Sequence, residues 1–133
     1  MRRPLVPLSI LAASLALSAC GSQGIQLAED DPDYAGAHIF AQRCWACHTL
    51  AAAGTEGSAV SVNSREYKDG PNFNQRAESA EDVLYAIQNG GFSSGPMPQQ
   101  ILTGDDAQAV ADFIEKYSGQ EAERPPNPQS SGQ

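Results

Sequence analysis

The feature that most constrains this chain is the pentapeptide CWACH, residues 44–48. It places two cysteines three residues apart, with a histidine directly after the second. Such a spacing occurs in redox-active dithiols, in parts of zinc sites and in covalent anchors for haem. Each of these chemistries requires a different surrounding fold, so the rest of the sequence discriminates between them.

A redox-active pair needs a βαβ context, with its first cysteine at the N-terminus of a helix that lowers the thiol pKa. Here the pair follows a predicted helix, and no stretch of the chain shows strand-like alternation of apolar and polar residues. A plain disulfide between Cys44 and Cys47 is also conceivable, but it gives His48 no role. The sequence disfavours both readings.

A structural zinc site needs four ligands in tetrahedral geometry. Outside the pentapeptide, the candidate ligands are His38, Cys20 near the N-terminus and scattered carboxylates. The adjacent Cys47 and His48 do not readily bind one small ion together. The sequence therefore disfavours zinc as well.

Covalent haem attachment accounts for every residue of the motif. On a helical turn, residues i and i+3 share one face, so Cys44 and Cys47 are placed to form thioethers with the two vinyl groups of a porphyrin. His48 then lies beneath the iron as its proximal ligand. Because C-x-x-C-H is the attachment spacing for this group, the sequence predicts one covalently bound haem c.

Haem iron of this kind takes a sixth ligand, and methionine opposite histidine raises the reduction potential. Met97 is the only methionine besides Met1, and Pro96 and Pro98 stiffen its loop. A loop methionine that packs as a flexible hydrophobe is the alternative. The rival ligand, His38, is too close in sequence to the attachment site to reach the opposite haem face. We therefore predict Met97 as the second iron ligand, beside His48, and His38 as a surface or partly buried residue.

The N-terminal segment reads as an export signal. Two arginines precede an almost uncharged apolar run at residues 5–19. This run is shorter than the roughly 20 residues of a membrane-spanning helix and fits a secretory signal peptide, residues 1–19. The sequence LSAC, ending at Cys20, is similar to a bacterial lipobox, in which the signal is cut before a cysteine that then carries lipid.

The alternative for Cys20 is an ordinary signal cut that leaves a free thiol, which is a liability in an oxidising compartment. We predict lipid attachment at Cys20 and a location on the extracytoplasmic, periplasmic-side face of a bacterial membrane. All 16 acidic residues but only six of the eight basic residues follow residue 19, so the net charge changes from −8 to −10 after the cut. This charge argues against nucleic-acid binding and against attachment to anionic lipid by charge alone, so the covalent anchor would hold the protein at the membrane.

The remaining chain divides into three parts. Residues 20–33 are polar and acidic and predict a lipid-anchored tether, residues 34–118 predict the folded domain, and residues 119–133, rich in Pro, Ser and Gln, predict a disordered tail. Within the domain, helices are predicted from Asp33 to Arg43, from Ser79 to Gly90 and from Thr103 to Gly119. The fold class is all-α, with a core so small that a large apolar group would help to fill it.

Taken together, residues 34–118 resemble the monohaem class I c-type cytochromes, and the whole chain resembles their lipoprotein-type, membrane-anchored bacterial members. Gly36 and Phe40 in the first helix and Phe113 and Tyr117 in the last look like the crossing terminal helices of that family. The resemblance implies the small cytochrome c fold: three main helices and long loops around one covalently bound haem.

Two further segments carry this resemblance. The segment KDGPNF matches the family's Gly-Pro stretch and implies that the Pro71 carbonyl accepts the Nδ1–H of His48. The dipeptide Met97-Pro98 matches the family's methionine loop. Residues 49–70 depart from the compact members. Three of their side chains are candidates for a haem propionate, although a solvated loop is the favoured reading: Arg65, Tyr67 and Lys68.

Ligation by histidine and methionine would close both axial positions, which suits a one-electron carrier rather than an enzyme. We therefore predict a membrane-tethered electron carrier of a bacterial respiratory chain. The expected partners are redox proteins, such as a quinol-oxidising complex and a terminal oxidase, with no nucleic acid and no small-molecule substrate. The alternatives are a haem enzyme or sensor with an open sixth site, either peroxidase-like or gas-binding, and a haem subunit of a larger oxidoreductase.

Overall fold

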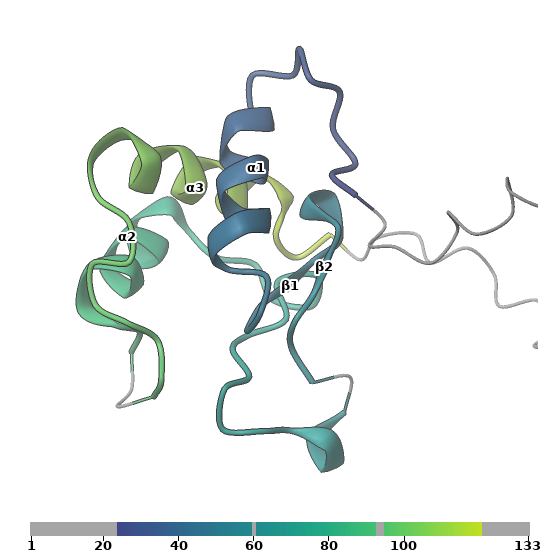
Figure 1. The fold of residues 1–133 in the computed structure, drawn as a ribbon, viewed down its shortest axis with the longest axis vertical. Coiled ribbons are helices and arrows are strands. Elements are labelled where there is room, and N and C mark those ends of the chain that lie inside the picture. Colours follow the sequence, from purple (N-terminus) through teal and green to yellow (C-terminus); the bar gives the residue numbers. More distant parts are fainter. Residues whose placement is uncertain (1–23, 60, 93–94, 121–133) are drawn as a thin grey trace, which may run out of the picture.

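A computed structural model describes residues 24–59, 61–92 and 95–120. Three α-helices dominate it: α1 (Tyr34–Arg43), α2 (Ala80–Asn89) and α3 (Gly104–Tyr117). Figure 1 shows α3 crossing behind α1, with α2 beside α3. The predicted helices and the small, mostly helical fold class are confirmed.

The boundaries of α2 follow from its capping residues. The Ser79 hydroxyl accepts a hydrogen bond from the backbone N–H of Asp82, which satisfies a donor that the helix itself leaves unpaired. At the other end, Gly90 adopts a left-handed conformation with φ of +80°, and its N–H donates to the carbonyl of Ala86. Both signals are readable from sequence, which is why the predicted and observed ends agree.

The crossing of α1 and α3 forms the centre of the core. A Cβ atom on Gly36 would lie 2.3 Å from the carbonyl oxygen of Ala109, so the helices approach through this glycine. Phe40 and Phe113 are fully buried and meet edge to face, with ring centroids 6.0 Å apart. The Asp33 carboxylate, which accepts a hydrogen bond from the Lys116 ammonium, also links the two helices.

The loop after the CWACH motif contains a short hairpin that the sequence did not predict. Strands β1 (Thr49–Leu50) and β2 (Thr55–Glu56) pair antiparallel, and they are joined by the 3-10 turn η2 (Ala51–Ala53) and a left-handed Gly54. A second 3-10 turn, η3 (Val62–Ser64), lies further along the loop. Strands of two residues are too short to show alternation, so the prediction lacked a signal there.

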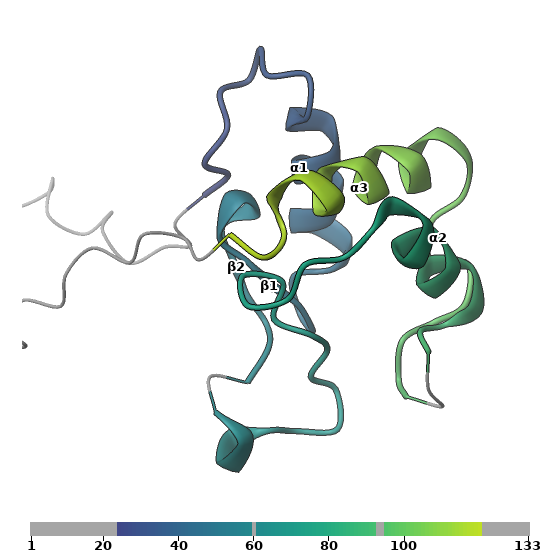
Figure 2. The same ribbon diagram turned by 180° about the vertical axis from the view of Figure 1, so that it is seen from behind.

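The described part of the predicted tether, residues 24–33, lies against the domain. Ile25 and Leu27 pack on the core, and the N–H of Gln26 donates to the carbonyl of Ala52. Seen from behind in Figure 2, this segment runs beside the hairpin before it enters α1. The packed part of the chain therefore begins before the predicted boundary at residue 34, because these two apolar side chains find a surface on the core.

Several predictions fall outside the described residues: the signal peptide, the lipid site at Cys20 and residues 121–133 of the predicted tail. Among the helices that the structure describes, none has both the length and the apolar character needed to cross a bilayer.

Candidate functional site: a cavity around the CWACH motif

A cavity of about 330 Å³ opens between the CWACH motif, the 65–73 loop, α2 and the Met97 loop. This volume is within the usual range for small-molecule and cofactor sites. Figure 1 shows the two loops descending from opposite sides of the helical core. The cavity brings together five of the predicted site residues: Cys44, Cys47, His48, Pro71 and Met97. Its apolar wall is formed by side chains of the helical core and its loops: Phe40, Phe73, Val83, Ala86, Ile87, Ile101, Val110 and Ile114.

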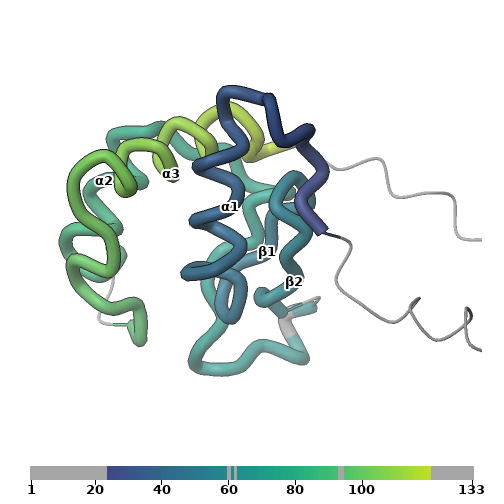
Figure 3. Tube along the Cα trace, turned by 45° about the horizontal axis from the view of Figure 1, so that its top comes forward, coloured from purple at the N-terminus to yellow at the C-terminus, as the bar shows by residue number. Residues whose placement is uncertain are grey.

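The cavity therefore occupies the place where a domain of this size would otherwise complete its core. Phe40, Phe73 and Val110 are buried in the core and also line the cavity. Figure 3 shows the chain curving around this side of the molecule, with α2 and α3 on one side of α1 and the hairpin on the other. An apolar group in the cavity would be enclosed by side chains that are already packed.

The two cysteines lie at the end of α1. The backbone N–H groups of Cys44, Cys47 and His48 continue helical hydrogen bonding, to Phe40 and then to Cys44. Cys44 and Cys47 are both free thiols, each partly buried. Burial, reinforced by the neighbouring Cys47, raises the pKa of Cys44 to about 12. A redox-active pair needs a lowered thiol pKa, so this environment argues against that reading.

The ring of His48 is held in one orientation. Its Nδ1–H donates to the carbonyl oxygen of Pro71 at 3.2 Å. Since a carbonyl only accepts, Nδ1 carries the proton, and in the neutral ring Nε2 has a free lone pair. Burial lowers the pKa of His48, an effect that the bond to Pro71 opposes, and the net lowering favours this neutral form. A neutral imidazole is the form that binds a metal.

Two residues that the sequence analysis missed also fix this ring. Phe73 stacks on His48, with centroids 4.9 Å apart and planes 11° from parallel. Gly70 lies so close to the ring that a Cβ atom there would be 2.3 Å from Cε1. The Gly70-Pro71 dipeptide in the KDGPNF segment is a signal that would have identified Gly70. Nothing in the sequence pairs Phe73 with His48.

Met97 is partly buried and packs against the core from the other side of the cavity. Its loop is tied to the end of α2, where the N–H of Gln100 donates to the Ile87 carbonyl at 2.8 Å. Gly90 lies directly against the loop: a Cβ atom there would be 2.8 Å from the carbonyl oxygen of Met97. The end of α2 therefore determines where the methionine lies.

The remaining residues considered from the sequence lie partly on the outer surface and partly on the cavity. His38 is exposed, stacks with Tyr34 and hydrogen-bonds with Gln42, so the expectation of a surface histidine is confirmed. Arg65 and Lys68 line the cavity, whereas Tyr67 is 79% exposed and outside its lining. Among the described residues, no group of three or more His, Cys, Asp or Glu side chains is placed to hold a metal ion, which argues against the zinc reading.

These residues fit a covalently attached haem. Two free thiols, a neutral imidazole with a free Nε2 and a thioether sulfur line one apolar cavity. In this arrangement Cys44 and Cys47 would hold the porphyrin edge, and His48 and Met97 would be available to the iron.

Comparison with known proteins agrees with this geometry. Residues 34–118 match the family model Cytochrome c. Among solved structures, the chain is similar to the c-type cytochrome SorU from Sinorhizobium meliloti, with 34% sequence identity and a TM-score of 0.51. That similarity covers 66% of this chain and 92% of SorU. A search of curated protein sequences found no match.

Proposed function

Because the chain belongs to the cytochrome c family and carries a covalent haem c, we propose that it is a membrane-tethered one-electron carrier with His48 and Met97 as axial ligands. The observation that carries the proposal is the placement of the two ligand candidates, from segments far apart in sequence, on one apolar cavity. The bound haem supplies a one-electron ferrous–ferric couple.

The protein's own residues would control that couple in three ways. The Pro71 carbonyl keeps the proton on Nδ1 of His48, which leaves Nε2 for the iron. The apolar wall, which includes Phe40 and Ile114, would shield the bound haem from water. Met97 would supply the second ligand to the iron, so that no substrate would have access to it. A closed site of this kind supports electron transfer rather than an enzymatic role.

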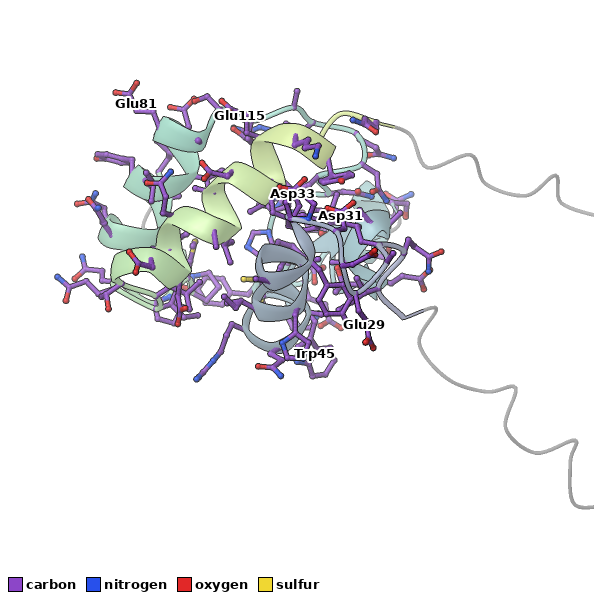
Figure 4. All side chains as sticks on the ribbon, turned by 90° about the horizontal axis from the view of Figure 1, so that it is seen from above. Glu29, Asp31, Asp33, Trp45, Glu81 and Glu115 are labelled. Atoms are coloured by element: carbon purple, nitrogen blue, oxygen red, sulfur yellow. The ribbon has the colours of Figure 1, made fainter. Side chains whose placement is uncertain are left out.

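We propose redox proteins as partners, in the class of a quinol-oxidising complex or a terminal oxidase. The basic residues on the cavity are partly neutralised within the chain, because Lys68 pairs with Asp69 at 2.7 Å and Arg76 pairs with Glu78. Acidic side chains extend from the rest of the surface; Figure 4 shows Glu29, Glu81 and Glu115 on the outside of the domain. This charge favours partners with basic docking surfaces and electron-transfer rates that fall with salt.

The decisive experiment is a pyridine haemochrome assay combined with the absorption spectrum of the purified ferric protein. We expect haem c bound through two thioethers and the far-red charge-transfer band of methionine-ligated ferric haem. Met97→Ala should abolish that band, whereas Ile101→Ala, which truncates another side chain on the same cavity, should keep it. A high-spin ferric spectrum that Met97→Ala leaves unchanged would instead show an open sixth site and favour the enzyme or sensor function.

The membrane tether is a separate part of the proposal and rests on the sequence LSAC before Gly21. We propose that Cys20 carries the lipid and that the protein resides on the extracytoplasmic face of a bacterial membrane. In fractionation at high salt, the unchanged chain should sediment with membranes and Cys20→Ser should be released. Retention of Cys20→Ser in the membrane fraction would exclude Cys20 as the anchor.

A further inference from the structure

Ser58 lies in the 49–70 segment and reaches the same backbone oxygen as His48. Its side chain is buried, and its hydroxyl donates to the Pro71 carbonyl at 2.9 Å. The Nδ1–H of His48 donates to that oxygen at 3.2 Å. The hydroxyl has one proton, and its other acceptor within reach, the Cys47 carbonyl, is farther away at 3.4 Å. The shorter distance assigns the proton to Pro71.

The position of Ser58 is fixed by a reciprocal pair of hydrogen bonds with Thr49. The N–H of Thr49 donates to the Ser58 hydroxyl oxygen at 3.0 Å, and the N–H of Ser58 donates to the Thr49 hydroxyl oxygen at 2.9 Å. Thr49 directly follows His48, and its carbonyl accepts the N–H of Phe73, which stacks on the ring. The hairpin therefore connects Ser58 rigidly to both sides of the histidine.

We propose that Ser58 is a positioning residue that sets the reduction potential of the haem by sharing the Pro71 carbonyl with His48. This inference rests on the proposed ligation of the iron by His48. A carbonyl oxygen has two lone pairs and can accept two hydrogen bonds. A second donor withdraws electron density from the oxygen, which makes the oxygen a weaker acceptor for the first donor. The Ser58 bond therefore weakens the bond to Nδ1–H. A histidine whose Nδ1–H is held less strongly is a less basic ligand, which favours the ferrous state and raises the potential.

This role gives the 49–70 segment a function beyond a solvated loop. Its first part holds the β1–β2 hairpin, and Ser58, two residues after β2, places its hydroxyl beside the Pro71 carbonyl that orients His48. The later residues Arg65 and Lys68 line the cavity instead. The segment thus contributes to the haem site in two places.

The test is a redox titration of Ser58→Ala, Ser58→Thr and a control in the purified holoprotein. At a fixed solution potential, Ser58→Ala should raise the ferric-to-ferrous ratio about threefold. This rise corresponds to a reduction potential lower by roughly 30 mV, since a tenfold change in the ratio is about 59 mV for one electron. Ser58→Thr retains the hydroxyl and should restore the potential. Thr55→Ala removes another buried hydroxyl of the same hairpin, one that accepts from Leu50 N–H and does not contact Pro71, and should leave the potential unchanged.

An unchanged or raised potential in Ser58→Ala would overturn the proposal, since loosening of the hairpin alone would lengthen the His48–Pro71 bond and raise the potential. If Ser58→Ala does not mature, NMR of the unchanged ferrous protein decides. The Ser58 hydroxyl proton should exchange slowly and show a cross-peak to Nδ1–H of His48, and a fast-exchanging proton without that cross-peak overturns the proposal. After oxidation of that protein, its ferric absorption spectrum separates this failure from a failure of the proposed ligation by His48 and Met97.

Discussion

The two sides of the cavity are built differently. On the His48 side, backbone and side-chain hydrogen bonds join three segments: the motif, the hairpin and the 70–74 loop. On the Met97 side, the described hydrogen bonds lie at the flanks of the loop, where Gln99 and Gln100 bond to the last turn of α2. His48 is held through its own ring, whereas Met97 is held through the backbone of its loop.

This difference has a mechanical consequence. A change beside His48 acts directly on the ring, because the ring is in contact with Pro71, Phe73 and Gly70. A change beside Met97 acts first on the backbone of its loop and reaches the sulfur indirectly. We therefore expect the His48 side to lose more stability when it is perturbed, and the Met97 side to lose its ligand first while the rest of the domain stays folded.

The largest effect should come from Gly70→Ala. The added methyl group would lie 2.3 Å from Cε1 and 2.7 Å from Nδ1 of His48, so either the ring or the loop has to move. Overpacking of this kind costs about 3 kcal/mol of unfolding free energy. Denaturant unfolding followed at the main haem absorption band measures the loss. A variant as stable as the unchanged protein would show that the His48 side is not rigid.

Gly90→Ala tests the Met97 side and should have the next largest effect. Gly90 has a φ of +80°, and its methyl group would lie 2.8 Å from the Met97 carbonyl oxygen. The left-handed conformation and the contact together cost about 2 kcal/mol. We expect the far-red methionine band to weaken while the haem remains covalently bound.

The matched control is Gly91→Ala. Its φ of +87° is similar, but its methyl group would contact Met97 only at an ordinary 3.9 Å. It should cost about 1 kcal/mol and keep the band. Equal loss of the band in both variants would mean that backbone strain, and not the close approach to Met97, disturbs the ligand.

The contrast between the two sides was only partly predictable from the sequence. The ends of α2 could be predicted because Ser79 and Gly90 act locally, and the CWACH motif and Met97 could be found because their residue types are chemically distinctive. Ser58 could not, because one serine in a Gly- and Ser-containing stretch carries no sign of a partner 13 residues away. The same holds for Ile25 and Leu27, two apolar residues in a polar stretch whose packing depends on a surface formed elsewhere in the chain.

Removal of a single hydrogen bond on either side of the cavity should cost less stability than the two glycine substitutions that force a close contact. The Asn74 side chain accepts from the N–H of Ala51 at 2.8 Å in a partly buried position, and Asn74→Ala leaves that donor unpaired at a cost of about 1.5 kcal/mol. Gln99→Ala removes an exposed bond to the Asn89 carbonyl and should cost about 0.5 kcal/mol or less. Chemical denaturation of both variants gives the comparison, and a larger loss for Gln99→Ala would reverse the order of the two sides.

The smallest effect on the haem site is expected at Ser79, which caps α2 and is outside the lining of the cavity. Ser79→Ala removes the acceptor for the N–H of Asp82 and should lower the free energy of unfolding by about 1 kcal/mol, whereas Ser79→Thr should recover most of it. Because Ser79 itself does not line the cavity, the methionine band and the reduction potential should both stay the same. A shifted potential in Ser79→Ala would mean that α2 transmits strain from its first turn to Met97 at the far end, and the two sides of the cavity would then not be independent.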